Sequence, residues 1–130
     1  ELLGSVSKAT QDKIIVTGAV TREELAALYS RANAFCYPSF LEGFGLPVLE
    51  AMSYGAPVVT SKDRSTEEVS GVAALTVDPL SVSEIAEALR LVLTDTSVAK
   101  ELGELGRARA KLFTWEATAA STVEVYRRLL

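Results

Sequence analysis

The stretch EGFGLPVLEAMSYGAPVVTS, from Glu42 to Ser61, is the part of the chain that decides the fold. The apolar run Ala34–Tyr37 before it predicts a strand that ends at Pro38, because proline cannot donate to a strand ladder. Within the stretch, a helix is predicted over Leu46–Tyr54, and Pro57–Thr60 then predicts another strand. This order of strand, glycine-rich turn, helix and strand is typical of parallel sheets.

The residues at the helix ends support this interpretation. Pro47 stands in the first turn, where its missing N–H costs nothing, and Gly55 stands where a C-terminal cap glycine belongs. The sequences that begin at Thr21 and Ser81 are capping boxes, each with a glutamate three residues on. The remaining predictions are strands over Ile14–Thr17 and Ala73–Val77, helices over Thr21 to about Ala32, Val82–Leu93, Asp95–Leu112 and Trp115 to about Leu129, and a loop with a short helical turn over Ser61–Ser70.

The predicted fold class is therefore α/β, a Rossmann-like parallel sheet flanked by helices. Continuous apolar strands are expected where both faces of a sheet are covered. Four strands are predicted, whereas a doubly wound domain usually has five or six. We expect the missing first strands to precede Glu1.

Composition narrows the function classes. The 130 residues fit a single domain, 1–130, with 48% hydrophobic and 23% charged residues and a net charge of −4. Lysines and arginines are scattered, so nucleic acid is not expected as a partner. The short basic run Arg107–Lys111 is typical of a solvated helix face. No run approaches the roughly 20 apolar residues of a membrane span, and the N-terminus does not resemble a signal peptide.

The chain has one cysteine and no histidine. Cys36 lies inside an apolar run, so we expect it to be a buried small hydrophobe. A single cysteine allows no internal disulfide, which suits a reducing compartment. The missing histidine removes the commonest general base and metal ligand.

The turn before the central helix has the chemistry of an anion site. A helix N-terminus offers free N–H groups and a partial positive charge, and glycines at 43 and 45 allow close approach of a ligand. Glu42 and Glu50 would repel a bare phosphate but could accept hydrogen bonds from hydroxyls on either side of a diphosphate. Helical side chains lean toward the N-terminus, so Glu50 can face the same pocket. The alternative is that Glu42 is solvated and Glu50 merely favours the helix dipole.

The segment Pro38–Met52 closely resembles the signature of the retaining GT-B glycosyltransferases often called group 1. Its core is a glutamate, seven residues and a second glutamate, matched here by Glu42 and Glu50. The resemblance extends over about Ile14–Leu130. Other matching segments are Val16–Val20, Leu28-Tyr29, Gly55–Ser61, Glu68-Val69, Asp78-Pro79 and Phe113–Glu116.

The resemblance implies two Rossmann-like domains, of which the C-terminal one, represented here, binds a nucleotide-sugar, while the N-terminal acceptor domain is absent. Glu42 would be catalytic, and Glu50 would hold the ribose hydroxyls. Val20 is implied as a contact to the base. The residues implied at the sugar–diphosphate junction are Gly43, Phe44, Gly45 and Leu46. The reaction would be sugar transfer from the nucleotide-sugar to an acceptor with retention, by electrostatic stabilisation of an oxocarbenium-like state.

The chain departs from the family pattern in two places. The family's basic pair, which neutralises the diphosphate, belongs to strands that would precede this chain, so we expect the isolated fragment to be inactive. Glu67 replaces a frequent proline, which we interpret as loop variation. The resemblance implies no metal and no cofactor, the nucleotide-sugar being substrate. It suggests a cytoplasmic location, with peripheral membrane association of a full-length enzyme left open.

Two further interpretations remain open. A non-catalytic module derived from the family would bind a nucleotide or a protein partner. A small structural domain of flavodoxin-like topology would use the turn only for packing. An exposed sheet edge could also drive self-association.

Overall fold

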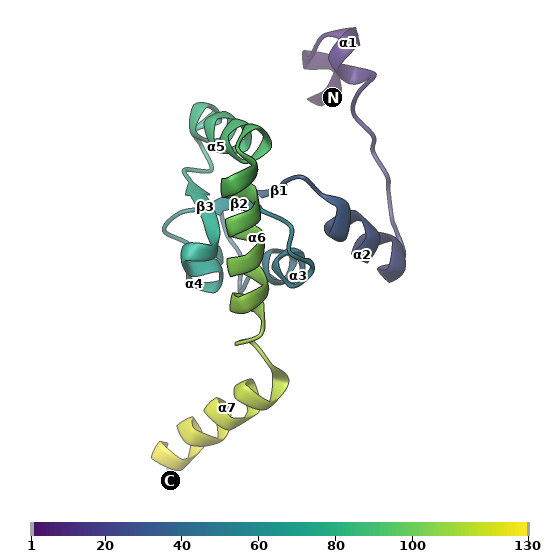
Figure 1. Ribbon diagram of the computed structural model, residues 1–130. Coiled ribbons are helices and arrows are strands. Elements are labelled where there is room, and N and C mark those ends of the chain that lie inside the picture. Colours follow the sequence, from purple (N-terminus) through teal and green to yellow (C-terminus); the bar gives the residue numbers. More distant parts are fainter. Residues whose placement is uncertain (1, 130) are drawn as a thin grey trace.

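The computed structural model describes residues 2–129 and contains one parallel sheet (Figure 1). Its strands are β1 (Phe35–Tyr37), β2 (Val58–Ser61) and β3 (Ala74–Val77), in the spatial order β1-β2-β3. Phe35 of β1 pairs with Val58 of β2, and Val58 pairs in turn with Ala74 of β3. Every connection is a crossover that carries a helix, which confirms the predicted α/β, Rossmann-like class.

Of the two predicted capping boxes, the one at Thr21 is complete, whereas at Ser81 only half forms, because the carboxylate of Glu84 accepts from the N–H of Asp78. Thr21 and Glu24 form both bonds of a capping box, and Ser81 and Asp95 each accept a backbone N–H at a helix start. Gly55 closes the central helix in the left-handed conformation. The helices are α1 (Lys8–Gln11), α2 (Arg22–Arg31), α3 (Leu46–Tyr54), α4 (Ser65–Ser70), α5 (Val82–Thr94), α6 (Thr96–Ala110) and α7 (Trp115–Leu129), with 3-10 turns η1 (Leu2–Ser5) and η2 (Gly71–Ala73).

A hydrophobic core lies on each face of the sheet. Val58 belongs to one core with residues of α2 and α3, including Tyr29 and Met52. Its neighbour Val59 points the other way and packs with Val92 of α5 and Leu102 of α6. β2 is buried along its whole length, so the prediction of a sheet covered on both faces holds for the central strand.

Helix α6 also packs against α3, and this contact depends on a glycine. A Cβ at Gly103 would lie 2.7 Å from the carbonyl oxygen of Gly55. The glycines at 103 and 106 are both buried within a continuous α6. They allow α6 to approach the end of the helix that carries the candidate site.

The predicted strand Ile14–Thr17 is not present. The side chains of Ile15 and Val16 are 85% and 76% exposed, and the segment runs from α1 to α2 away from the sheet (Figure 1). β-branched residues favour a strand only where another strand can pair with it. Among residues 2–129 no strand lies beside this segment, so its apolar pattern stays unpaired.

The prediction for Cys36 was also wrong, because its side chain is exposed. Cys36 pairs with Val59 and therefore faces the α5–α6 side, but those helices cover β2 and β3. Partial burial still raises the pKa of the thiol. The segment Ser61–Ser70 contains a fuller helix than expected, since α4 occupies its second half.

Candidate functional site

The glycine-rich turn lies where β1 ends and α3 begins. Gly45 is the residue before α3 and has a φ of 99°, and a Cβ there would lie 2.9 Å from Cγ2 of Thr66. The fold therefore requires glycine at 45. Packing does not require glycine at 43, because nothing lies within 4 Å of the position that a Cβ would take there. The space above the backbone at 43 is open.

Backbone donors face the same turn. The amides of Val48 and Leu49 both donate to the carbonyl of Gly45. No bond to another described residue uses the amides of Phe44, Gly45 or Leu46, and Pro47 has no donor. The start of α3 thus presents unpaired N–H groups beside the bare backbone of Gly43, a suitable environment for an anion.

Glu42 is held in place by its neighbours. Its carboxylate accepts hydrogen bonds from Tyr37 Oη at 2.6 Å and from Ser39 Oγ at 3.3 Å, and its carbonyl accepts from Ser65 Oγ at 2.8 Å. Ser39 in turn exchanges two 2.7 Å bonds with the hydroxyl of Ser61. The bond to Glu42 raises the pKa of the Tyr37 phenol, so Tyr37 stays a donor at neutral pH. Glu42 is therefore not the freely solvated carboxylate of the alternative interpretation.

Glu50 has a different phenol as its partner. It lies on α3 and accepts a long hydrogen bond of 3.4 Å from Tyr29 Oη. Burial, and then the charge of Glu50, raise the pKa of Tyr29 to about 12. The carboxylate of Glu50 is exposed and lines a hollow of about 390 Å³ between α2 and α3, together with Arg22 and Ser53.

A row of aromatic rings joins the two tyrosines. Tyr37 stacks on Phe35 with ring centroids 5.8 Å apart, and Phe35 meets the edge of Tyr29 at 5.3 Å. The row therefore runs from the partner of Glu42 to the partner of Glu50. Sequence reasoning treated these rings only as apolar residues. The signal that it missed is that two of the three carry a hydroxyl, which a buried tyrosine usually bonds.

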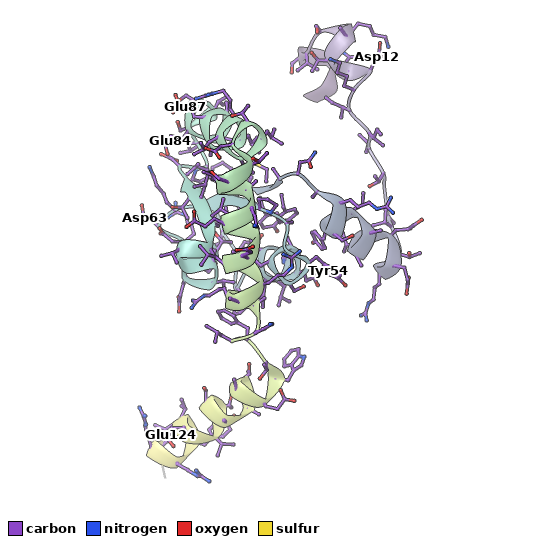
Figure 2. The ribbon with its side chains drawn as sticks, viewed as in Figure 1. Asp12, Tyr54, Asp63, Glu84, Glu87 and Glu124 are labelled. Atoms are coloured by element: carbon purple, nitrogen blue, oxygen red, sulfur yellow. The ribbon has the colours of Figure 1, made fainter. Side chains whose placement is uncertain are left out.

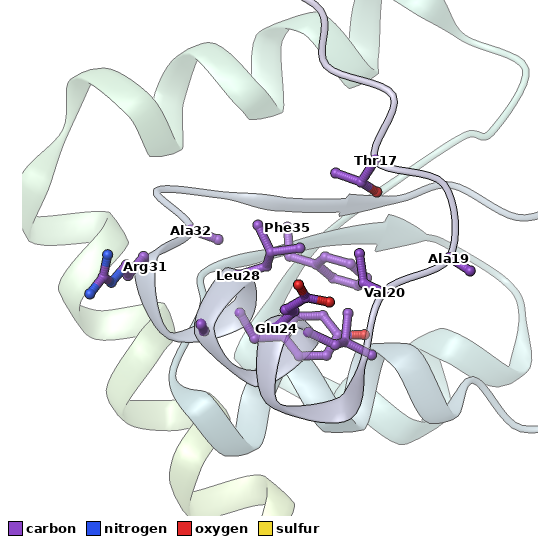
Figure 3. Close-up of a pocket in the computed structure, with 11 residues that line it drawn as sticks. Thr17, Ala19, Val20, Glu24, Leu28, Arg31, Ala32 and Phe35 are labelled. Atoms are coloured by element: carbon purple, nitrogen blue, oxygen red, sulfur yellow. The ribbon is translucent and has the colours of Figure 1, made fainter.

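Val20 lies in a groove beside β1. The groove has a volume of about 880 Å³ and is lined by α2, by the segment before it and by Phe35 (Figure 3). Figure 3 shows Val20 and Leu28 near the ring of Phe35, with Thr17 and Ala19 further along the segment. Glu42–Leu46 lie at the start of α3, whereas the groove of Val20 shares its lining residues Leu25 and Tyr29 with the hollow at Glu50.

The described residues contain no group of three or more acidic, cysteine or histidine side chains that could hold a metal ion. Within the same part of the chain, no helix is long and apolar enough to cross a bilayer. The site is built from backbone amides, carboxylates and hydroxyls.

Comparison with known proteins connects this site to a family. The profile described as "Glycosyl transferases group 1" matches residues 6–109, which include the strands, the turn and most of the helices. The chain belongs to this family. The match includes Glu42, Glu50 and the glycine-rich turn between them.

Relatives within the group 1 family share much of the sequence. O-antigen chain mannosyltransferase B of Escherichia coli is 46% identical over 86% of this chain and 29% of its own length. An MMP alpha-(1->4)-mannosyltransferase of Mycolicibacterium hassiacum is 38% identical over 92% of this chain and 30% of its own. The chain thus spans less than a third of the length of these relatives.

A solved structure shows the same fold. Sucrose-phosphate synthase from Thermosynechococcus elongatus matches 91% of this chain and 30% of its own, with a TM-score of 0.80 and 36% identity. The arrangement of parallel strands and covering helices is therefore shared with a group 1 glycosyl transferase relative.

Proposed function

We propose that this chain is the donor-binding part of a retaining glycosyltransferase, which transfers a hexose from a nucleotide-sugar to an acceptor. Family membership supports the transferase, and the mannosyltransferases among the relatives support a hexose. Donor binding, retention and independence of metal are our proposals. The inactivity of the isolated chain is likewise a proposal.

The observation that carries the proposal is the contrast between the two glycines of the turn. Packing accounts for Gly45, whereas the fold leaves Gly43 facing open space beside unpaired amides. A bare backbone at that point lets a diphosphate come within hydrogen-bond distance of the amides of Phe44, Gly45 and Leu46.

The carboxylates would then act on the hydroxyls and charge around that diphosphate. Glu42, fixed by Tyr37 and Ser39, would bind the transferred sugar and offset positive charge at its anomeric carbon. Glu50 would accept hydrogen bonds from the ribose hydroxyls in the hollow beside α2. Val20 remains the proposed contact to the base, which would have to reach the groove beside β1. We also propose a cytoplasmic location.

The test is an amide chemical-shift titration of the chain with UDP, GDP, ADP and their sugar conjugates. We expect shifts at Phe44–Leu46 and near Glu50 with one nucleotide. Glu50→Ala should weaken that binding by about tenfold or more, because a hydrogen bond to a charged group contributes about 1.5–3 kcal/mol. Glu101→Ala, an exposed glutamate on α6, is the control. Binding that is unchanged in Glu50→Ala would contradict the ribose assignment.

A further inference from the structure

Arg109, near the end of α6, lies at the centre of a set of contacts that the donor site alone does not explain. The sequence placed it on a solvated helix face, but the side chain is half-buried and makes three directed contacts. Its Nε donates to the carbonyl of Val69 at 2.9 Å and its Nη2 to the carbonyl of Glu68 at 2.8 Å. The guanidinium carbon also lies 5.0 Å from the ring centroid of Phe113.

The first route from Arg109 runs through α4. Glu68 and Val69 are in the last turn of this helix, where carbonyls lack partners inside the helix and favour a cation. At the other end of α4, Ser65 Oγ donates to the carbonyl of Glu42 and Thr66 packs against Gly45. By fixing the end of α4, Arg109 fixes the position from which α4 contacts the turn.

The second route runs through two aromatic rings. The ring of Phe113 meets that of Phe44 edge to face, with centroids 5.8 Å apart. Phe44 is 41% exposed, and the contact with the ring of Phe113 restrains it. The guanidinium of Arg109, which lies over the ring of Phe113, restrains that ring in turn. Both routes therefore end on the four residues from Glu42 to Gly45.

We propose that Arg109, together with Phe113, is a positioning residue that holds the turn in its binding conformation. This inference rests on the proposed donor site. It adds two residues outside that site to those that determine the affinity for the nucleotide. A turn that is already fixed loses less conformational freedom when a ligand binds, so loosening it lowers affinity without removing any ligand contact.

The test compares two arginines of one helix. Arg109→Lys keeps the charge but loses the pair of hydrogen bonds to the carbonyls of α4 and the stacking of the guanidinium on Phe113. Arg107→Lys is the matched control, because Arg107 also donates to a carbonyl, that of Tyr54, but lies outside the contacts to the turn. We expect Arg109→Lys to move the amide signals of Phe44, Gly45 and Leu46, and Arg107→Lys to leave them in place.

Phe113 supplies a second pair of variants should Arg109→Lys fail to fold. Phe113→Leu should move the same signals and weaken binding of the preferred nucleoside diphosphate by about tenfold, whereas Phe113→Tyr, which keeps the ring, should restore both. Turn signals that stay at their original positions in folded Phe113→Leu and Arg109→Lys would overturn the inference. So would equal weakening by Phe113→Leu and Phe113→Tyr.

The two proposals can fail separately. If no nucleotide binds the unaltered chain, the donor assignment fails in this chain, while movement of the turn signals in Arg109→Lys but not in Arg107→Lys still supports the positioning role.

Discussion

At the scale of single residues, the structure separates glycines and tyrosines that look alike in sequence. Gly43 and Gly45 are two positions apart, yet only the second has a positive φ and a close neighbour. Tyr29 and Tyr37 each donate to one carboxylate of the motif and have raised pKa values. The chemical roles of these residues follow from what lies next to them, which the one-dimensional pattern does not state.

The glycines yield a prediction that separates folding from binding. Gly45→Ala should lower the free energy of unfolding by about 1–2 kcal/mol, because a Cβ disfavours left-handed backbone and would meet Thr66. Gly43→Ala should change stability by less than about 0.5 kcal/mol but weaken nucleotide binding. Urea denaturation measures the first effect and the amide titration measures the second. Normal nucleotide binding by Gly43→Ala would argue against close approach of a ligand at position 43.

At the scale of elements, Glu84 connects α5 to the ends of β2 and β3. This side chain of α5 accepts a hydrogen bond from the backbone N–H of Asp78 after β3 and forms an ion pair with Lys62 after β2, at 3.2 Å. The bond from Asp78 and then the contact with Lys62 hold the pKa of Glu84 below its ordinary value. The ends of β2 and β3 are thereby fixed to one helix, close to the loop that leads into α4.

This lowered pKa predicts how stability depends on pH. A carboxyl with a lower pKa in the folded than in the unfolded state stabilises the fold above its unfolded pKa of about 4.3, and this contribution is lost as pH falls through the folded pKa. Glu84→Gln should therefore be less stable than the unaltered chain at pH 7, and the difference should shrink in acid. Urea denaturation across this pH range measures it.

Glu87→Gln is the control, since Glu87 lies near Glu84, one turn along α5 (Figure 2). No hydrogen bond joins the side chain of Glu87 to another described residue. A difference between Glu84→Gln and the unaltered chain that stays constant from pH 7 into acid would show that the carboxylate's charge is not the cause.

The elements also show which sequence signals suffice. α3 was predicted to both ends because Pro47 and Gly55 act through their own backbone geometry. The prediction of a strand over Ile14–Thr17 was wrong because a strand needs a neighbouring strand to pair with, and local sequence does not show whether one is present. The prediction for Arg109 was wrong for a similar reason: the helical pattern of its neighbours carries no information about carbonyls 40 and 41 positions earlier.

At the scale of the whole molecule, the two edges of the sheet differ. Beside β3, the surface is lined with the charged residues Glu84, Glu87 and Arg90. Beside β1 lies the large groove, whose lining is mostly apolar. Charged side chains are a usual means of keeping sheet edges apart, and the larger β1 groove has only Glu24 and Arg31 among its lining residues.

We therefore predict that the isolated chain self-associates through the β1 side. Leu28→Lys, which places a charge in the groove, should reduce association measured by sedimentation equilibrium. Leu91→Lys, at a similarly exposed leucine beside β3, should have little effect. A chain that stays monomeric at every concentration, or that responds equally to both substitutions, would contradict this prediction.

The order of the strands bears on how the molecule folds. Each strand pairs with the next along the chain, with paired residues 23 positions apart (35 to 58) and then 16 (58 to 74). Loops of this length close at modest entropic cost, whereas α6 must reach back to residues such as Tyr54, 53 positions from Arg107. We expect the sheet to form first and α6 to dock late.

Leu102→Ala, in the buried face of α6, should then speed unfolding while barely changing the refolding rate. Slower refolding would instead place α6 in the folding nucleus. If α6 does dock late, the glycine-rich turn is fixed late as well, because the proposed restraint arrives with the helix that carries Arg109. A newly folded chain would pass through an interval in which it has its sheet but not yet the fixed turn on which the proposed binding depends.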